Sequence, residues 1–100
     1  MLLEICVDSV ESARAAAESG AHRLELCGDL MVGGISPSPF LIEAAQKMDI
    51  PVNVLLRPRF GDFCYTRWER DILMQEAELC RKRGVNGVVV GALEPDGRLD

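Results

Sequence analysis

The chain has 100 residues, of which 48% are hydrophobic and 27% charged, and its formal net charge at pH 7 is −5. That length allows one domain, and the composition is typical of an ordinary globular protein. The negative charge argues against nucleic acid as a partner, because phosphate recognition needs clustered lysine and arginine.

The start of the chain shows no targeting signal. Met1, Leu2 and Leu3 run directly into Glu4, without the basic start and apolar region of a signal peptide. No apolar run approaches the roughly 20 residues that a membrane-spanning helix needs. The four cysteines lie 21, 37 and 16 residues apart and form no C-x-x-C pair. We therefore expect a cytoplasmic protein with reduced thiols and no membrane partner.

The pattern of the chain predicts four strands, over residues 2–7, 23–27, 51–57 and 86–91, with a helix between each pair. The first helix follows Asp8 or Ser9, runs to about Ser19 and ends at Gly20, which suits a left-handed C-terminal residue. Ser38 and Pro39 predict the start of the second helix, because proline is favoured at the first helical position.

Two buried helical stripes are predicted from the spacing of apolar residues. That of the second helix comprises Leu41, Ala44, Ala45 and Met48. The third helix covers residues 66–83 and ends at Gly84, and Thr66 with Glu69 forms a capping box at its start. Its predicted buried residues are Trp68, Ile72, Leu73, Ala77 and Cys80.

The alternation of strands and helices predicts a parallel α/β sheet with right-handed crossovers. One parity of each strand is apolar and the other is mixed, which is typical of the wall of a (β/α) barrel of the TIM type. Such a barrel usually takes about 250 residues, so residues 1–100 form a single partial domain holding its first half. We interpret the chain as the first half of a longer one; the alternative is that two copies complete each other. We expect a homo-oligomer, because open edge strands need cover.

Two strands carry the same pattern near their carboxyl ends, Glu4-Ile5-Cys6 and Glu25-Leu26-Cys27. Within each, the glutamate and cysteine share the inner face. Two thiols on neighbouring strands could hold one Cu(I) ion, which soft ligands suit; otherwise the cysteines pack as small hydrophobic side chains. Glu4 and Glu25 are either partners in an internal salt-bridge network, with arginines such as Arg23, or a general acid/base pair.

The segment between the third strand and the third helix carries several charged side chains that could bind a ligand. Arg57 and Arg59 flank Pro58, and their guanidinium groups could each form bidentate hydrogen bonds to a carboxylate or a phosphate. Asp62 could complete this substrate-binding group or neutralise one of the arginines. Placed after the third strand, the segment lies at the end of the barrel where active sites form.

Several of these motifs together resemble the CutC copper homeostasis protein family. They are LEICVDS (3–9), RLELC (23–27), GGISPS (33–38), RPRFGDFCY (57–65) and VVGAL (89–93). The resemblance covers essentially the whole chain. It implies a cytoplasmic (β/α)8 barrel, often oligomeric, that takes part in copper homeostasis and binds copper. It also implies a Cu(I) site at Cys6 and Cys27, where the family's cysteine pair falls.

Two functions are therefore expected from the sequence. The first is a copper homeostasis protein that binds Cu(I) through Cys6 and Cys27. The alternative is a barrel enzyme acting on a small anionic or hydroxylated metabolite, with Glu4 or Glu25 transferring protons while Arg57 and Arg59 hold the anion. The copper-binding hypothesis gives the two glutamates and the two arginines no role, whereas the enzyme hypothesis does.

Overall fold

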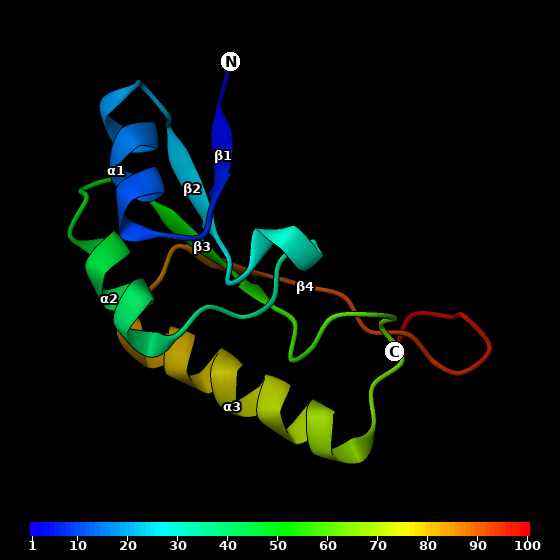
Figure 1. The fold of residues 1–100 in the computed structure, drawn as a ribbon. Coiled ribbons are helices and arrows are strands. Elements are labelled where there is room, and N and C mark those ends of the chain that lie inside the picture. The colour runs from blue at the N-terminus through cyan, green and yellow to red at the C-terminus, as the bar shows by residue number, and fades with distance from the viewer.

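A computed structural model describes all residues from 1 to 100 and shows one parallel sheet with helices on one side (Figure 1). The sheet order is β1-β2-β3-β4, each strand pairing in parallel with the next. The strands are β1 (Glu4–Val7), β2 (Arg23–Leu26), β3 (Val52–Leu56) and β4 (Gly87–Val90). The helices are α1 (Val10–Glu18), α2 (Pro39–Gln46) and α3 (Arg67–Arg83), with a short 3-10 helix, η1, at Leu30–Val32. The predicted fold class, the first half of a (β/α) barrel, is confirmed.

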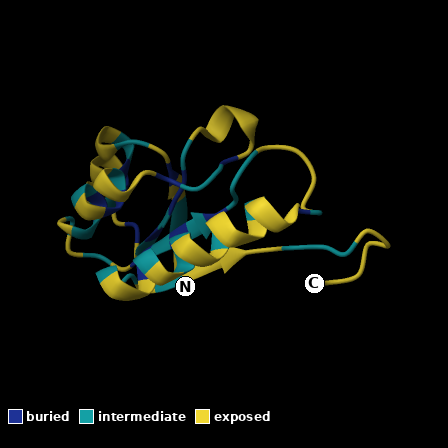
Figure 2. Cartoon of the chain, turned by 90° about the horizontal axis from the view of Figure 1, so that it is seen from below, coloured by how far each residue is buried: buried dark blue, intermediate teal, exposed yellow.

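The hydrophobic core lies between the outer face of the sheet and the helices. Leu24 and Val54 on the central strands are fully buried, and Ile42 and Ala45 of α2 pack into the same cluster. The apolar parity predicted for the first three strands therefore points to the helices. On β4 the same parity is less covered: Val88 is 43% exposed and Val90 51% exposed. Figure 2 shows β4 and the outer sides of the helices as exposed surface.

The predicted helix ends are largely confirmed. Ser9 caps α1 and exchanges hydrogen bonds with Ser12, and the Ser38 side chain accepts from the Leu41 backbone at the start of α2. Gly84 ends α3 in the left-handed conformation. The Thr66 side chain accepts from the Glu69 backbone, as expected.

The predictions for Glu69 and for the buried stripes need correction. Glu69 does not close the capping box, because its carboxylate instead accepts a hydrogen bond from Arg59. In α3 only Cys80 is fully buried, while Trp68 is 68% exposed and Ile72 48% exposed. Leu73 and Ala77 of the predicted stripe are partly buried and pack against the core cluster, so the prediction holds for the part of α3 that faces the sheet. In α2 the most buried pair is Ile42 and Ala45 rather than the whole predicted stripe.

Candidate functional site

The face of the sheet opposite the helices, here called the inner face, carries the polar strand residues. The register pairs Glu4 with Arg23 and Cys6 with Glu25 across β1 and β2. The two Glu-x-Cys patterns are thus staggered by two residues, so that Glu25 lies level with Cys6 and Cys27 lies beyond both. Cys27 follows the last residue of β2, at the carboxyl end of the sheet, where barrel proteins build their active sites.

Glu4 is engaged in a polar network low on the inner face. Its Oε1 accepts from Arg23 Nε at 3.0 Å and from Asn53 Nδ2 at 2.9 Å. Asn53 Oδ1 in turn accepts from Asn86 Nδ2 at 2.9 Å. This arrangement matches the predicted salt-bridge network, with Arg23 as the partner. The two asparagines were not predicted, although Asn53 stands out as an amide in an otherwise apolar strand.

Glu25 contacts both candidate metal ligands. The Cys6 thiol, which is exposed, donates to Glu25 Oε2 at 3.3 Å, and Cys27 Sγ lies 3.8 Å from the Glu25 carbonyl oxygen. Partial desolvation, the hydrogen bond to Glu25 and its charge raise the pKa of Cys6. Burial, followed by the charges of Glu25, Cys6 and Asp8, raises the pKa of Cys27 to about 12. Both thiols therefore hold their protons at neutral pH.

This protonation gives a first testable prediction, on the reactivity of Cys27. A thiol with a pKa of about 12 is about 1,000 times less ionised at pH 8 than one with the ordinary pKa of 9.0, and only the thiolate reacts. We expect iodoacetamide to label native Cys27 at least that much more slowly than Cys27 in the urea-unfolded chain. The rate should rise about tenfold per pH unit. Peptide mass spectrometry after timed quenching measures it, and equal rates in the two states would contradict the assigned environment.

Arg57 joins two loops at the carboxyl end of the sheet. Its Nη1 donates to the carbonyl oxygens of Val32 and Gly34, at 3.3 and 3.0 Å, and its Nη2 donates to that of Gly61 at 2.7 Å. The guanidinium group also stacks 4.9 Å from the centre of the Phe63 ring. Arg57 thus holds the segment after β2 against the segment after β3.

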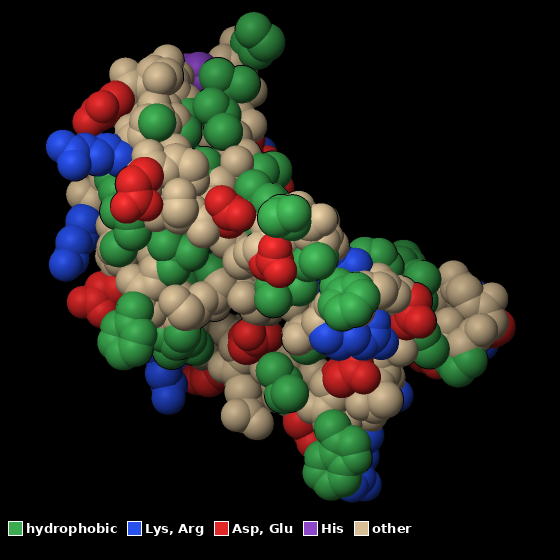
Figure 3. All heavy atoms as spheres, viewed as in Figure 1, with side chains coloured by type: hydrophobic (Ala, Val, Ile, Leu, Met, Phe, Trp, Pro, Cys, Tyr) green, Lys and Arg blue, Asp and Glu red, His purple; other side chains and the backbone are tan.

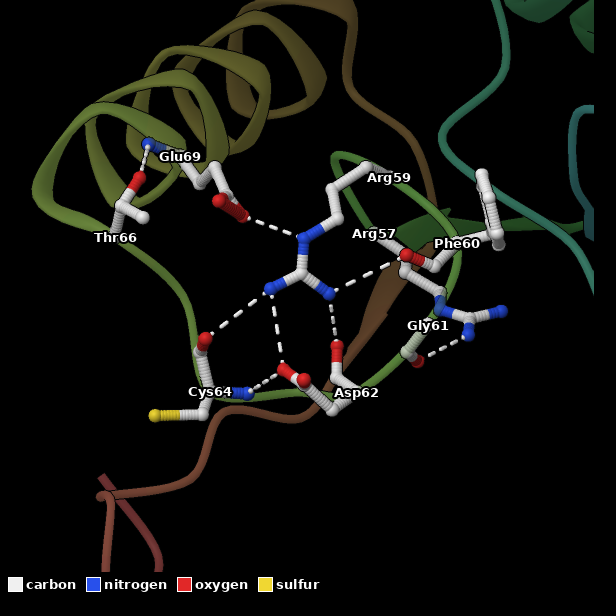
Figure 4. Close-up of polar contacts among 8 residues, drawn as sticks. All are labelled: Arg57, Arg59, Phe60, Gly61, Asp62, Cys64, Thr66 and Glu69. Atoms are coloured by element: carbon white, nitrogen blue, oxygen red, sulfur yellow. Dashed lines mark hydrogen bonds and ion pairs between the residues drawn. The ribbon is translucent and has the colours of Figure 1, made fainter.

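Arg59 organises the loop that leads into α3 (Figure 4). Its Nε donates to Glu69 Oε2 at 2.7 Å, and its Nη2 donates to Asp62 Oδ1 at 3.2 Å and to the Cys64 carbonyl oxygen at 3.1 Å. The Cys64 backbone N–H, followed by the Arg59 side chain, lowers the pKa of Asp62. Asp62 therefore neutralises Arg59, one of the two roles considered for it. Both arginines donate hydrogen bonds to groups of their own chain. Anion binding by Arg57, Arg59 and Asp62 stays a prediction.

A carboxylate that the sequence did not single out lies behind this loop. Ser36 Oγ donates to Glu76 Oε1 at 2.9 Å and accepts from the Arg57 backbone N–H at 2.8 Å. Burial raises the pKa of Glu76, although the Ser36 hydrogen bond acts in the opposite direction. Glu76 and Ser36 join α3 to the segment before α2 and line a small apolar cavity with Cys80.

The raised pKa of Glu76 predicts how stability depends on pH. The folded state binds the Glu76 proton more tightly than the unfolded state, so the native chain gains stability as the pH falls through the folded pKa toward the ordinary value of 4.5. Glu76→Gln has no such proton. We expect the wild type to gain stability relative to Glu76→Gln as the pH is lowered over this window. Urea unfolding at several pH values measures the difference, and a constant or opposite trend would contradict it.

Two general findings bear on partners. No helix combines the length and apolar character needed to cross a bilayer. No cluster of three or more histidine, cysteine, aspartate or glutamate side chains is arranged to hold a metal ion. Copper binding by Cys6 and Cys27 stays a prediction.

The fold and the inner face together define half of a (β/α)-barrel protein with free thiols near the carboxyl ends of its first two strands. Comparison with known proteins identifies the group. The chain belongs to the CutC family, whose model matches residues 1–100.

Named relatives agree with this assignment. A family protein CutC from Agrobacterium fabrum is 45% identical over 100 residues, covering 100% of this chain and 40% of the relative. The copper homeostasis protein cutC homologs of Mus musculus and Homo sapiens are each 45% identical over 100 residues, covering 99% of this chain and 37% of theirs. The chain thus spans about two fifths of the length of these relatives.

A solved structure shows the same fold. It is described as a candidate copper homeostasis protein CutC from Streptococcus agalactiae, with 30% identity and a TM-score of 0.89. The match covers 100% of this chain and 50% of that one. Half of the solved chain therefore has no counterpart among these 100 residues.

Proposed function

We propose that this protein binds Cu(I) through Cys6 and Cys27 as part of copper homeostasis. The observation that carries the proposal is two free thiols on neighbouring segments: Cys6 on β1 contacts the Glu25 carboxylate, and Cys27, directly after β2, contacts the Glu25 carbonyl oxygen. Thiolates are soft ligands, and two of them suit Cu(I) better than zinc, which takes four ligands in structural sites. Relatives named as copper homeostasis proteins give the proposal its biological setting.

The donor set fits a cargo ion that must be released again. Cys6 is exposed and offers an accessible ligand, while Cys27 is only 2% exposed and offers a desolvated one. Each thiol gives up its proton when the metal binds, so copper binds more tightly as the pH rises. The proposal includes a cytoplasmic location, where thiols stay reduced.

Anaerobic Cu(I) titration against a competing chelator tests this proposal. We expect one Cu(I) per wild-type chain, and a loss of affinity of more than about 100-fold in the Cys6→Ser/Cys27→Ser double variant, since a lost ligand costs more than a lost supporting contact. Cys64→Ser is the matched control, because Cys64 is a free, partly exposed thiol in another loop. Equal Cu(I) affinity in the double variant and the wild type would show that Cys6 and Cys27 do not bind the ion.

A further inference from the structure

The segment that follows β2 folds back over Cys27 as a short hairpin. Gly28 and Ile35 form an antiparallel bridge through two backbone hydrogen bonds, of 2.6 and 2.8 Å, and residues 28–35 are called the hairpin below. Gly34 packs directly on the thiol, since a Cβ at this glycine would lie 3.4 Å from Cys27 Cβ and 3.5 Å from Cys27 Sγ. The hairpin is therefore part of what buries Cys27, which is 2% exposed.

Apolar packing does little to keep the hairpin in place. None of its residues belongs to the hydrophobic core cluster or to the partly buried apolar side chains around that cluster. Met31 in η1 is 97% exposed, and in the space-filling view hydrophobic side chains lie on the surface over η1 (Figure 3, oriented as Figure 1). The Asp29 backbone has a φ of +40°, a left-handed conformation that a residue other than glycine rarely adopts. Polar contacts with neighbouring segments are thus needed to hold this conformation.

Two charged side chains supply these polar contacts. Arg57, directly after β3, donates from Nη1 to the carbonyl oxygens of Val32 and Gly34, at 3.3 and 3.0 Å. The second of these carbonyl groups belongs to the residue that packs on the Cys27 thiol. On the other side of the hairpin, the Leu30 backbone N–H donates to Asp8 Oδ2 at 3.1 Å. Arg57 therefore contacts the hairpin backbone where it covers the thiol.

Arg57 is itself held on its other side. Its Nη2 donates to the Gly61 carbonyl oxygen at 2.7 Å (Figure 4), and its guanidinium group stacks 4.9 Å from the centre of the Phe63 ring. The side chain thus joins the hairpin to a second, separately supported loop. We propose that Arg57 holds the hairpin over Cys27 and is thereby a positioning residue that limits access to this thiol.

This role goes beyond copper binding and does not depend on it. The contacts that carry it lie within the copper-free protein, and Arg57 bonds to the hairpin backbone rather than to the thiol. If Cys27 binds Cu(I) as proposed above, displacement of the hairpin also sets how fast the ion enters and leaves. The experiment below uses copper-free protein, so failure of the metal site and failure of this role are told apart.

Iodoacetamide labelling, followed by peptide mass spectrometry, measures access to Cys27. Cys80 serves as an internal reference, because it is 1% exposed within the core cluster and reacts when the whole fold opens. In Arg57→Gln we expect Cys27 to react at least about tenfold faster than in the wild type, since one hydrogen bond to a charged group is worth about that factor. The Cys80 rate should change much less. Loss of a positive charge alone would disfavour the thiolate and slow the reaction, so a faster reaction reports access.

Two further variants complete the comparison. Arg59→Gln is the matched control, because the hydrogen bonds of Arg59 all go to residues 60–69, and Cys27 should react at the wild-type rate. Arg57→Lys keeps the charge but replaces the planar fork of donors with a single ammonium group. We expect it to give an intermediate Cys27 rate.

Several results would overturn the proposal. One is a Cys27 rate in Arg57→Gln equal to that of the wild type. Another is a rise that Cys80 shares in full, because the substitution would then destabilise the whole fold instead of releasing the hairpin. Far-UV circular dichroism checks the folding of each variant, and if Arg57→Gln is unfolded, Arg57→Lys decides by the same ratio of Cys27 to Cys80 rates. Unfolding of both variants would also refute the proposal, since Arg57 would then support the entire fold.

Discussion

Leu24→Ala is expected to remove a large part of the stability of this chain. Leu24 is 0% exposed at the centre of β2, level with Ile5 on one side and Val52 on the other. Truncating a buried leucine costs about 2–5 kcal/mol, because apolar contact is lost and a cavity remains. Domains of this size have about 5–15 kcal/mol in total, so the loss should be visible as a large shift of the urea midpoint.

The matched control is Ile72→Ala on α3. Ile72 is 48% exposed, so its truncation removes much less buried apolar surface than that of Leu24. We expect a loss below about 1 kcal/mol there. The slope of the unfolding transition should stay the same in both variants, as expected when only stability changes. Equal losses in the two variants would mean that the core does not lie where the structure has it.

Gly34→Ala is expected to be the second severe substitution, since it combines two costs. Gly34 is buried with φ +94°, a conformation that side chains rarely adopt. A Cβ there would lie 3.0 Å from Leu55 Cδ2 and 3.4 Å from Cys27 Cβ. Backbone strain of this kind costs about 1–3 kcal/mol, and overpacking a filled site adds about 1–3 kcal/mol more.

Gly20→Ala separates the two costs. Gly20 has a similar φ of +99°, but no atom lies within 4 Å of the position of its Cβ. We expect Gly20→Ala to show the backbone cost alone, and the difference between the two variants to report the contact with Leu55 and Cys27. Urea unfolding measures both. A Gly20→Ala loss equal to that of Gly34→Ala would show that the close approach has no energetic effect.

The parts of the fold that depend on local signals were predictable from the sequence. Ser38 with Pro39, Thr66 and Gly84 act on their own helix ends, so their roles follow from neighbouring residues. The alternation of strands and helices likewise gave the parallel sheet. The sequence could not determine which apolar helix residues are buried by a neighbouring element. Trp68 and Ile72 have helical spacing suited to a core, but their burial depends on an element that would have to pack beside α3.

The site was predictable to a similar degree. Alternation placed Glu4, Cys6, Glu25 and Cys27 on one face, and the register then decided which of them meet. Because β1 and β2 are staggered by two residues, Glu4 lies opposite Arg23 and bonds to it, and Glu25 lies opposite Cys6 and bonds to it. The choice of Glu69 as a partner for Arg59, and of Ser36 for Glu76, depends on loop paths between distant segments. No pattern within either segment contains that information.

The most direct test of the central claim is a double-mutant cycle on Cu(I) affinity. If Cys6 and Cys27 bind one ion as a pair, removing either thiol dismantles the site. Cys6→Ser and Cys27→Ser should then each lose nearly as much affinity as the double variant, giving a strongly non-additive cycle. Additive losses, or a single variant that binds like the wild type, would show that the two cysteines do not share an ion.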